Sequence, residues 1–422
     1  MRRVQASKES GVMKKIIFLL PLLSGLTITH AGDWPGWRGT DRTDVSKETG
    51  LLQEWPESGP KLTWLSKEGG LGYSGFSVVG NRLFTMGAFD QKEKLLALNA
   101  LTGKKLWEVE VGALLTNNWG DGPRMSPAVA DGLVYALGGR GKLVCVEVET
   151  GKIRWSKGLV EDLGGKVPGW GYTESVLVDQ GRVICTPGGK KGTLAALDAK
   201  TGNVLWQSKD FTDGAQYSSP IAIEHGGNRQ YVQLVMKNLV GIKADNGDLL
   251  WKSAWPGRTA VIPTPIHDDG FVYISSGYGV GCKLVKLGTN SAEDVYDNKI
   301  MKNHHGGVIK LGDHLYGYSD GYGWVCQDFK TGELVWNEKK ALGKGAIAYA
   351  DNRFICQSER DGNVVLIEAS PTGWKEMGRF VLTPQTLLRK KSGKIWTHPV
   401  ISNGKLYLRD QELIFCFDVK SG

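Results

Sequence analysis

The 422-residue sequence is poor in the residues that build metal centres and redox sites. It has seven histidines and six cysteines, and it lacks both a C-x-x-C pair and the C-x-x-C-H motif of c-type haem attachment. It also lacks the H-E-x-x-H, G-x-S-x-G and glycine-rich phosphate-binding motifs. These absences argue against a haem protein, a zinc protease, an α/β-hydrolase and a P-loop domain, and no metal site is predicted.

Helical periodicity and a strong charge imbalance are also missing. The 58 glycines, 15 tryptophans and 13 tyrosines suit many short strands joined by tight turns. Residues 1–31 hold five of the 52 basic and one of the 44 acidic residues, so the remainder has 47 basic against 43 acidic residues. This small excess predicts no nucleic-acid partner, and we interpret the basic run at 389–394 as a solvated loop.

The N-terminus carries a targeting signal. The stretch "MKKIIFLLPLLSGLTITHA" has a basic start, an apolar middle, and Thr29 and Ala31 before a predicted cleavage point. We therefore interpret residues 1–31 as a signal peptide, with Met13 as a second possible translation start and an uncleaved anchor as the alternative. The apolar run is short and interrupted, so we expect no membrane span after cleavage and a periplasmic or secreted protein.

A repeat dominates the rest of the chain. Five segments fit the pattern small-x-x-x-x-[TN]-G-x-x-x-W, as in "ALDAKTGNVLW". In each, alternating apolar residues predict a strand, the Thr-Gly or Asn-Gly pair predicts a reversal, and the tryptophan is expected to be buried on the next strand. The tryptophans at this position are Trp107, Trp155, Trp206, Trp251 and Trp336.

A second repeat of two further strands precedes each copy of the first, as in "MSPAVADGLVYAL". Together they recur about every 46 residues and predict four-stranded antiparallel sheets arranged as propeller blades. Counting the copies predicts an all-β, eight-bladed β-propeller over residues 60–422. Seven blades is the alternative, if the weak unit at 282–300 is only an insertion.

The two ends of the chain predict how the ring closes. Residues 416–422 begin another copy of the turn motif but stop at its glycine, whereas residues 60–69 supply an isolated strand with Trp64 at the required place. We therefore predict that the N-terminal strand completes the last blade, which pairs two otherwise exposed edges. Residues 32–59 are left as an N-terminal extension.

These motifs resemble the PQQ-like β-propeller repeat, which is found in quinoprotein alcohol dehydrogenases and outer-membrane assembly propellers and is similar to other WD40/YVTN-like repeats. The resemblance implies the fold over residues 60–422. It also implies a possible PQQ cofactor with Ca²⁺ on the propeller axis. The family's cofactor ligands, its Asp base and its adjacent cysteine pair cannot be matched one by one to this sequence. No cofactor is therefore firmly implied.

In a propeller, the loops that lead into the innermost strands form a funnel suited to binding. Seven side chains at these positions are predicted to bind a ligand: Tyr73, Arg124, Tyr172, Tyr217, Lys344, Trp396 and His398. If the protein is an enzyme, the candidate catalytic residues are His304, His305, Glu174 and Asp121. The adjacent histidines lie in the loop before one inner strand and would face the same funnel.

The preferred hypothesis is a monomeric binding propeller with no catalytic activity, whose partner is a small molecule, a saccharide or a protein. The first alternative is a PQQ-dependent oxidoreductase acting on an alcohol, sugar or polymer. The second is a polysaccharide hydrolase or lyase. Fold alone does not choose among them, since one fold carries many functions.

Overall fold

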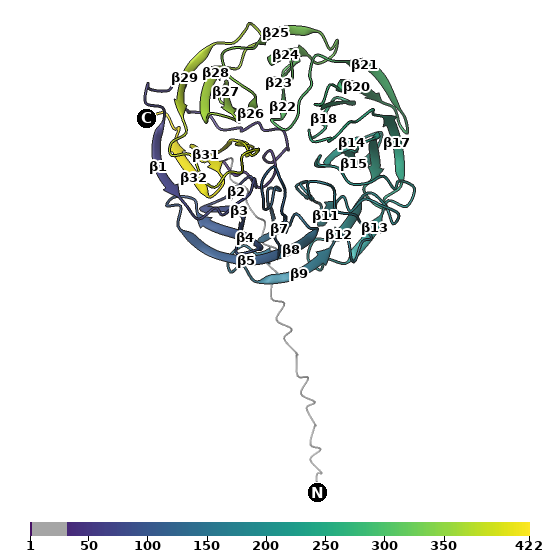
Figure 1. Cartoon of the computed structure of the whole chain (residues 1–422). Coiled ribbons are helices and arrows are strands. Elements are labelled where there is room, and N and C mark those ends of the chain that lie inside the picture. Colours follow the sequence, from purple (N-terminus) through teal and green to yellow (C-terminus); the bar gives the residue numbers. More distant parts are fainter. Residues whose placement is uncertain (2–31) are drawn as a thin grey trace.

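The computed structural model describes Met1 and residues 32–422, so the predicted signal peptide lies almost entirely outside the described residues. Within them, the regular elements are 32 β-strands in eight antiparallel sheets of four strands each. The sheets stand as blades around a common axis (Figure 1). The predicted eight-bladed propeller is confirmed, and the seven-bladed alternative is wrong because residues 281–298 form half of a complete blade.

The strands follow one order in every blade, from the axis outward. The innermost strands are β2 (Ser77–Val79), β6 (Ala128–Ala130), β10 (Leu177–Asp179), β14 (Ile221–His225), β18 (Ile266–Asp268), β22 (Val308–Leu311), β26 (Gly345–Ala350) and β30 (Val400–Ser402). The second strands are β3 (Arg82–Phe89), β7 (Leu133–Leu137), β11 (Arg182–Cys185), β15 (Asn228–Leu234), β19 (Phe271–Ser276), β23 (His314–Ser319), β27 (Arg353–Ser358) and β31 (Lys405–Asp410). The third strands are β4 (Lys92–Asn99), β8 (Lys142–Glu147), β12 (Ala195–Asp198), β16 (Asn238–Lys243), β20 (Gly281–Leu287), β24 (Gly323–Asp328), β28 (Asn363–Glu368) and β32 (Leu413–Asp418). The outermost strands are β5 (Lys105–Ala113), β9 (Ile153–Gly158), β13 (Val204–Gln207), β17 (Leu249–Ala254), β21 (Ala292–Asn298), β25 (Leu334–Glu338), β29 (Glu376–Val381) and β1 (Lys61–Ser66).

The last blade joins the two ends of the chain, as predicted. Strand β1 pairs antiparallel with β32, and Trp64 lies opposite Cys416. The sheet order is β1-β32-β31-β30, so the N-terminal strand is the outer edge of a blade whose other three strands come from the C-terminus. The pairing satisfies the backbone groups of β32 and fastens the ring.

The repeat tryptophans connect neighbouring blades. The Trp206 indole Nε1 donates to the Ala244 carbonyl at 2.9 Å, and a Cβ added to Gly247 would lie 2.6 Å from the Trp206 ring. Gly247 also has φ +82, so its turn requires glycine for both its backbone conformation and its contact. The corresponding donor and acceptor pairs are Trp64 to Ala100, Trp107 to Val148, Trp155 to Ala199 and Trp336 to Ser370.

Three blades vary this contact, and in one of them, β26–β29, Arg379 stands opposite Val365 where the other blades have an aromatic side chain. Trp251 is buried, but its Nε1 donates to the Gln230 side chain instead of a turn carbonyl. In the next blade Tyr296 replaces the tryptophan, and its hydroxyl donates to the Phe329 carbonyl at 3.0 Å. This replacement is why the sequence motif is weak at 282–300 although the blade is complete.

The N-terminal extension, residues 32–59, crosses the ring near its axis (Figure 1). It forms isolated bridges with two inner strands on different sides of the ring, Trp34 with Val78 and Val45 with Tyr349. The buried Arg42 donates to backbone carbonyls of a third blade, at Ser175. The extension therefore closes one end of the central channel.

Candidate functional site

A cavity of about 490 Å³ lies on the axis, where the loops lead into the innermost strands. Its walls contain residues from all eight blades, so the predicted funnel exists as a single hollow. It brings together these predicted residues: Tyr73, Arg124, Tyr217, His304, His305, Lys344, Trp396 and His398.

Tyr172 and Glu174 lie outside the cavity lining. Tyr172 is buried and donates to the Pro187 carbonyl at 2.9 Å. Glu174 is buried and accepts from the Thr186 backbone N–H, and burial raises its pKa to about 7. Their neighbours Thr173 and Ser175 line the cavity instead. Successive side chains of an extended segment point to opposite sides, so the assignment from the sequence was one residue out of register here.

Asp121 also lies outside the lining. Its carboxylate accepts from the Asn117 backbone N–H at 2.8 Å and pairs with Lys390 at 2.7 Å. This contact joins the loop before β6 to the basic loop at 389–394. The basic loop is therefore attached over the cavity, and its last residue, Lys394, lines the wall.

The floor of the cavity comes from the N-terminal extension. The Trp37 ring lies 4.6 Å from the His398 ring, and its Nε1 donates to Thr264 Oγ1 at 2.9 Å. Beneath it, Arg38 and Asp44 form a buried ion pair at 2.6 Å. Burial would raise the pKa of Asp44, but Arg38 and His398 together hold that pKa below its ordinary value. The extension has no repeat register, so the sequence did not indicate this floor.

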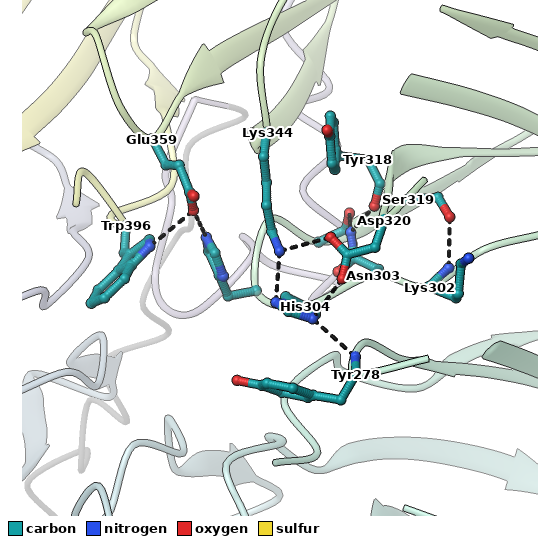
Figure 2. Close-up of polar contacts among 12 residues, drawn as sticks. Tyr278, Lys302, Asn303, His304, Tyr318, Ser319, Asp320, Lys344, Glu359 and Trp396 are labelled. Atoms are coloured by element: carbon teal, nitrogen blue, oxygen red, sulfur yellow. Dashed lines mark hydrogen bonds and ion pairs between the residues drawn. The ribbon is translucent and has the colours of Figure 1, made fainter. Parts of the chain in front are cut away.

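One wall carries a three-residue polar cluster (Figure 2). Lys344 Nζ lies 2.6 Å from His304 Nδ1 and 2.9 Å from Asp320 Oδ1, while His304 Nε2 lies 2.7 Å from Asp320 Oδ2. Burial would raise the pKa of Asp320, but its hydrogen bonds to His304 and Lys344 hold the pKa well below the ordinary value. Asp320 is therefore an ionised partner that orients the two lining side chains.

Tyr278 fixes the His304 ring from the other side (Figure 2). The two rings stack at 4.3 Å with 19° between their planes. Tyr278 has φ +57, a conformation that is costly for a bulky side chain and is typical of functional sites when the surroundings enforce it. A Cβ added to the preceding Gly277 would lie 1.4 Å from His304 Cδ2, so this close stacking requires glycine there.

A second polar pair lies beside the first. Glu359 Oε2 accepts from Trp396 Nε1 at 3.1 Å and lies 3.0 Å from His305 Nε2 (Figure 2). Burial lowers the pKa of His305. Burial would raise the pKa of Glu359, but His305 and Trp396 outweigh it and that pKa lies below its ordinary value. Both pKa shifts are consistent with a neutral His305 beside an ionised Glu359.

Aromatic side chains cover much of the remaining wall. They are Trp37, Tyr73, Trp119, Trp170, Tyr217, Tyr278 and Trp396. Neighbouring rings are tilted, with 51° between Tyr73 and Trp396, whereas Trp170 and Tyr217 stack at 5.1 Å. The wall thus offers paired aromatic rings that face in different directions.

The donor chemistry does not fit a calcium-held quinone. Calcium takes six to eight oxygen ligands, mainly from carboxylates and carbonyls. Glu359, the carboxylate in the lining, is engaged by His305 and Trp396, and Asp320 behind it is engaged by His304 and Lys344. Among residues 32–422, no group of three or more potential metal-ligating side chains gathers. We therefore derive no step through PQQ or Ca²⁺.

Fold and repeat together define a propeller built from PQQ-like repeats. A family model described as outer membrane protein assembly factor BamB matches residues 91–338, which is more than half of the chain. The protein belongs to this family of PQQ-like propeller repeat proteins. In the part of the chain that the structure describes, no helix is long and apolar enough to cross a membrane.

Relatives of different kinds share the repeat. The dehydrogenase subunit of the quinone alcohol dehydrogenase of Gluconacetobacter polyoxogenes is 29% identical over 198 residues, which is 44% of this chain and 27% of that protein. The assembly factor BamB of Alkalilimnicola ehrlichii is 29% identical over 213 residues, 48% of each chain. The crystal structure of the quinohemoprotein alcohol dehydrogenase of Comamonas testosteroni matches with a TM-score of 0.60 at 13% identity, over 93% of this chain and 81% of that one, and supports the fold alone. The aligned region spans less than half of either curated relative.

Proposed function

We propose that the protein is a periplasmic or secreted binding propeller that holds a short saccharide in its axial funnel and does no chemistry on it. The observation that carries this proposal is the set of aromatic rings that line a hollow of about 490 Å³ at different angles. A cavity of this size holds a small molecule or a few sugar rings, not a folded protein.

The aromatic platforms match the shape of sugars. A pyranose ring presents polarised C–H groups on its faces, and these groups pack against the negative face of an aromatic ring. A puckered oligosaccharide needs platforms at different angles, whereas one flat cofactor needs parallel rings on both of its faces. The tilt of 51° between Tyr73 and Trp396 favours the oligosaccharide.

Hydroxyl groups supply part of the polar surface of the lining. Sugar hydroxyls both donate and accept hydrogen bonds, as do serine and threonine side chains. The lining hydroxyl residues are Thr173, Ser175, Ser219, Thr259, Ser392 and Thr397. They come from the loops that lead into four blades, so a ring bound at the centre has hydroxyl neighbours on more than one side.

The carboxylates of the cavity argue against hydrolysis. Most glycosidases place two carboxyl groups across the scissile bond, one of them as an acid with a raised pKa. Here the carboxylate in the lining is Glu359, whose pKa lies below its ordinary value. Asp320 is held behind the lining by His304 and Lys344.

The test is binding of purified protein to an immobilised array of neutral and acidic oligosaccharides. We expect the wild type to bind a subset of the array and Trp170→Ala to lose at least about tenfold in affinity, because the variant removes a lining platform. Trp374→Ala is the matched control, since Trp374 lies outside the cavity lining and its Nε1 donates to Glu376 at the surface. Binding to no saccharide would overturn the proposal.

A parallel assay addresses the dehydrogenase alternative. The protein is incubated with PQQ and Ca²⁺ and then desalted. We expect no retained quinone absorbance and no dye reduction with alcohols or sugars. Retained absorbance that Trp170→Ala abolishes would replace the saccharide proposal with the oxidoreductase.

A further inference from the structure

The charges of the cavity lining are strongly unbalanced. Four lining side chains are cationic, Arg124, Lys344, Arg360 and Lys394, against the single lining carboxylate of Glu359. Lys344 has a counter-ion in Asp320. For the other three cations, no carboxylate of residues 32–422 lies within ion-pair distance. Unpaired cations facing a hollow favour an anion there.

Arg124 is the most constrained of these cations. Its Nη1 donates to the Gly122 carbonyl at 3.0 Å and its Nη2 to the Gly120 carbonyl at 2.8 Å, and the guanidinium lies 5.5 Å from the Tyr73 ring centre. A guanidinium has five N–H donors, so these contacts leave three for a ligand. Burial lowers the pKa of Arg124, which an anion beside it would offset.

Lys394 reaches the same wall from the basic loop. A Cβ added to the preceding Gly393 would lie 2.8 Å from the Tyr73 hydroxyl, so the loop backbone contacts the tyrosine that carries Arg124 on its ring. The Trp396 ring lies 4.9 Å from the Tyr73 ring. Arg124 and the backbone before Lys394 therefore both contact Tyr73, whose ring also neighbours Trp396.

The carboxylate of the lining does not cancel this charge. Glu359 is satisfied by Trp396 and His305 on its own part of the wall. Asp121, at the mouth, is satisfied by Lys390. Glu93 and Asp121 act on Arg124 from beyond ion-pair distance, so among residues 32–422 Arg124 and Lys394 have no ion-pair partner.

We propose that the saccharide is acidic: a uronic-acid-containing oligosaccharide whose ring stacks on Trp396 while its carboxylate pairs with Arg124 and Lys394. This inference rests on the proposed function and adds the charge and orientation of the ligand. A planar carboxylate matches two parallel N–H donors of a guanidinium, which is why the arginine is more than a point charge.

The experiment measures affinity by calorimetry for three trisaccharides of equal length. One is a uronate trisaccharide, chosen as the best acidic binder among gluco, galacto and manno forms. The second is its neutral counterpart with reduced carboxyl groups, and the third is a sulfated counterpart. We expect the uronate to bind at least about thirtyfold more tightly than the neutral sugar, with an affinity that falls as salt is raised.

Variants locate the charge recognition. Arg124→Gln is expected to lower uronate affinity at least about tenfold and to leave the affinity for the neutral sugar within about twofold. Arg124→Lys should recover only part of the loss, because it keeps the charge without the paired donors. Lys394→Gln is the second variant if Arg124→Gln melts early. Lys375→Gln is the matched control, because Lys375 lies outside the lining and pairs with Glu368 at the surface.

Four outcomes overturn the inference. Equal binding of neutral and acidic sugars would remove the acidic ligand but leave the proposed function intact. Tighter binding of the sulfated sugar would remove the carboxylate preference. Equal effects of Lys375→Gln and Arg124→Gln would remove the assigned site, and binding of none of the three sugars would remove the proposed function as well.

Discussion

Two regions of this propeller are held together in different ways: the rim, where the outermost strands of neighbouring blades meet, and the axis. At the rim, one contact is repeated: a tryptophan from one blade packs on the turn glycine of the next and donates to a backbone carbonyl there. At the axis, charged contacts occur once each, such as the Arg38–Asp44 pair and the His304–Asp320–Lys344 cluster. The repeated contacts at the rim stabilise the ring, whereas the contacts at the axis differ from blade to blade around the cavity.

The largest effect is expected from deleting residues 33–69. The deletion removes β1 with Trp64 and also the segment that crosses the axis, so it exposes the edge of β32 and opens the channel. We expect the melting temperature to fall by about 10 °C or more in a calorimetric scan. Deleting only residues 33–49 keeps β1 and separates the two regions. A truncated protein that melts at the parent temperature would show that neither contact matters.

The next largest effect tests the rim alone. Trp206 is 8% exposed, so Trp206→Ala should cost about 3–5 kcal/mol of unfolding free energy by leaving a cavity between blades. Trp119 at the cavity mouth is 47% exposed, and Trp119→Ala should cost less than about 1 kcal/mol. Urea titration of both variants gives the two values. Equal losses would contradict the division between rim and axis.

A substitution at the axis should lower ligand affinity more than it lowers stability. In Gly277→Ala the new Cβ would collide with His304, so the ring must leave its stacked position against Tyr278. We expect saccharide affinity to fall about tenfold, while the unfolding free energy changes by about 1 kcal/mol or less because the two residues are only partly buried. A large loss of stability with unchanged affinity would show that this cluster is structural.

The last prediction concerns the pH dependence of stability, an effect that builds up gradually over more than two pH units. Burial raises the pKa of Glu174 from 4.5 to about 7 in the folded protein. Between these values the unfolded chain loses this proton and the folded chain keeps it, so stability is full below about pH 4.5 and falls as the pH rises toward 7. The expected loss is up to about 3 kcal/mol. Glu174→Gln should flatten this part of the stability profile, and an unchanged profile would contradict the raised pKa.

The sequence predicted the rim more fully than the axis. Five tryptophan motifs at a fixed spacing were enough to count the blades, because each copy repeats the same packing contact. The weak blade was uncertain only because Tyr296 replaces the tryptophan. Ring closure could be predicted because the motif copy at 416–422 lacks its tryptophan, which Trp64 supplies.

The candidate site was predicted only where it follows the repeat. Positions such as Tyr73, Arg124 and Lys344 could be placed because each precedes an inner strand. Tyr172 and Glu174 were assigned one residue out of register, since a strand's alternation reverses with a shift of one. Trp37 and Tyr278 could not be found this way, because the first lies in the extension and the second in a glycine-flanked turn with φ +57.

Because the extension crosses the axis, the central channel is open at one end and closed at the other. Trp37 forms its base, and the buried Arg38–Asp44 pair lies beneath that base. A continuous polymer cannot thread through such a molecule, so a chain can be gripped only by an end or a side branch. If the proposed saccharide binding holds, the number of protein molecules bound per polysaccharide should therefore follow the count of chain ends and not the length of the chains.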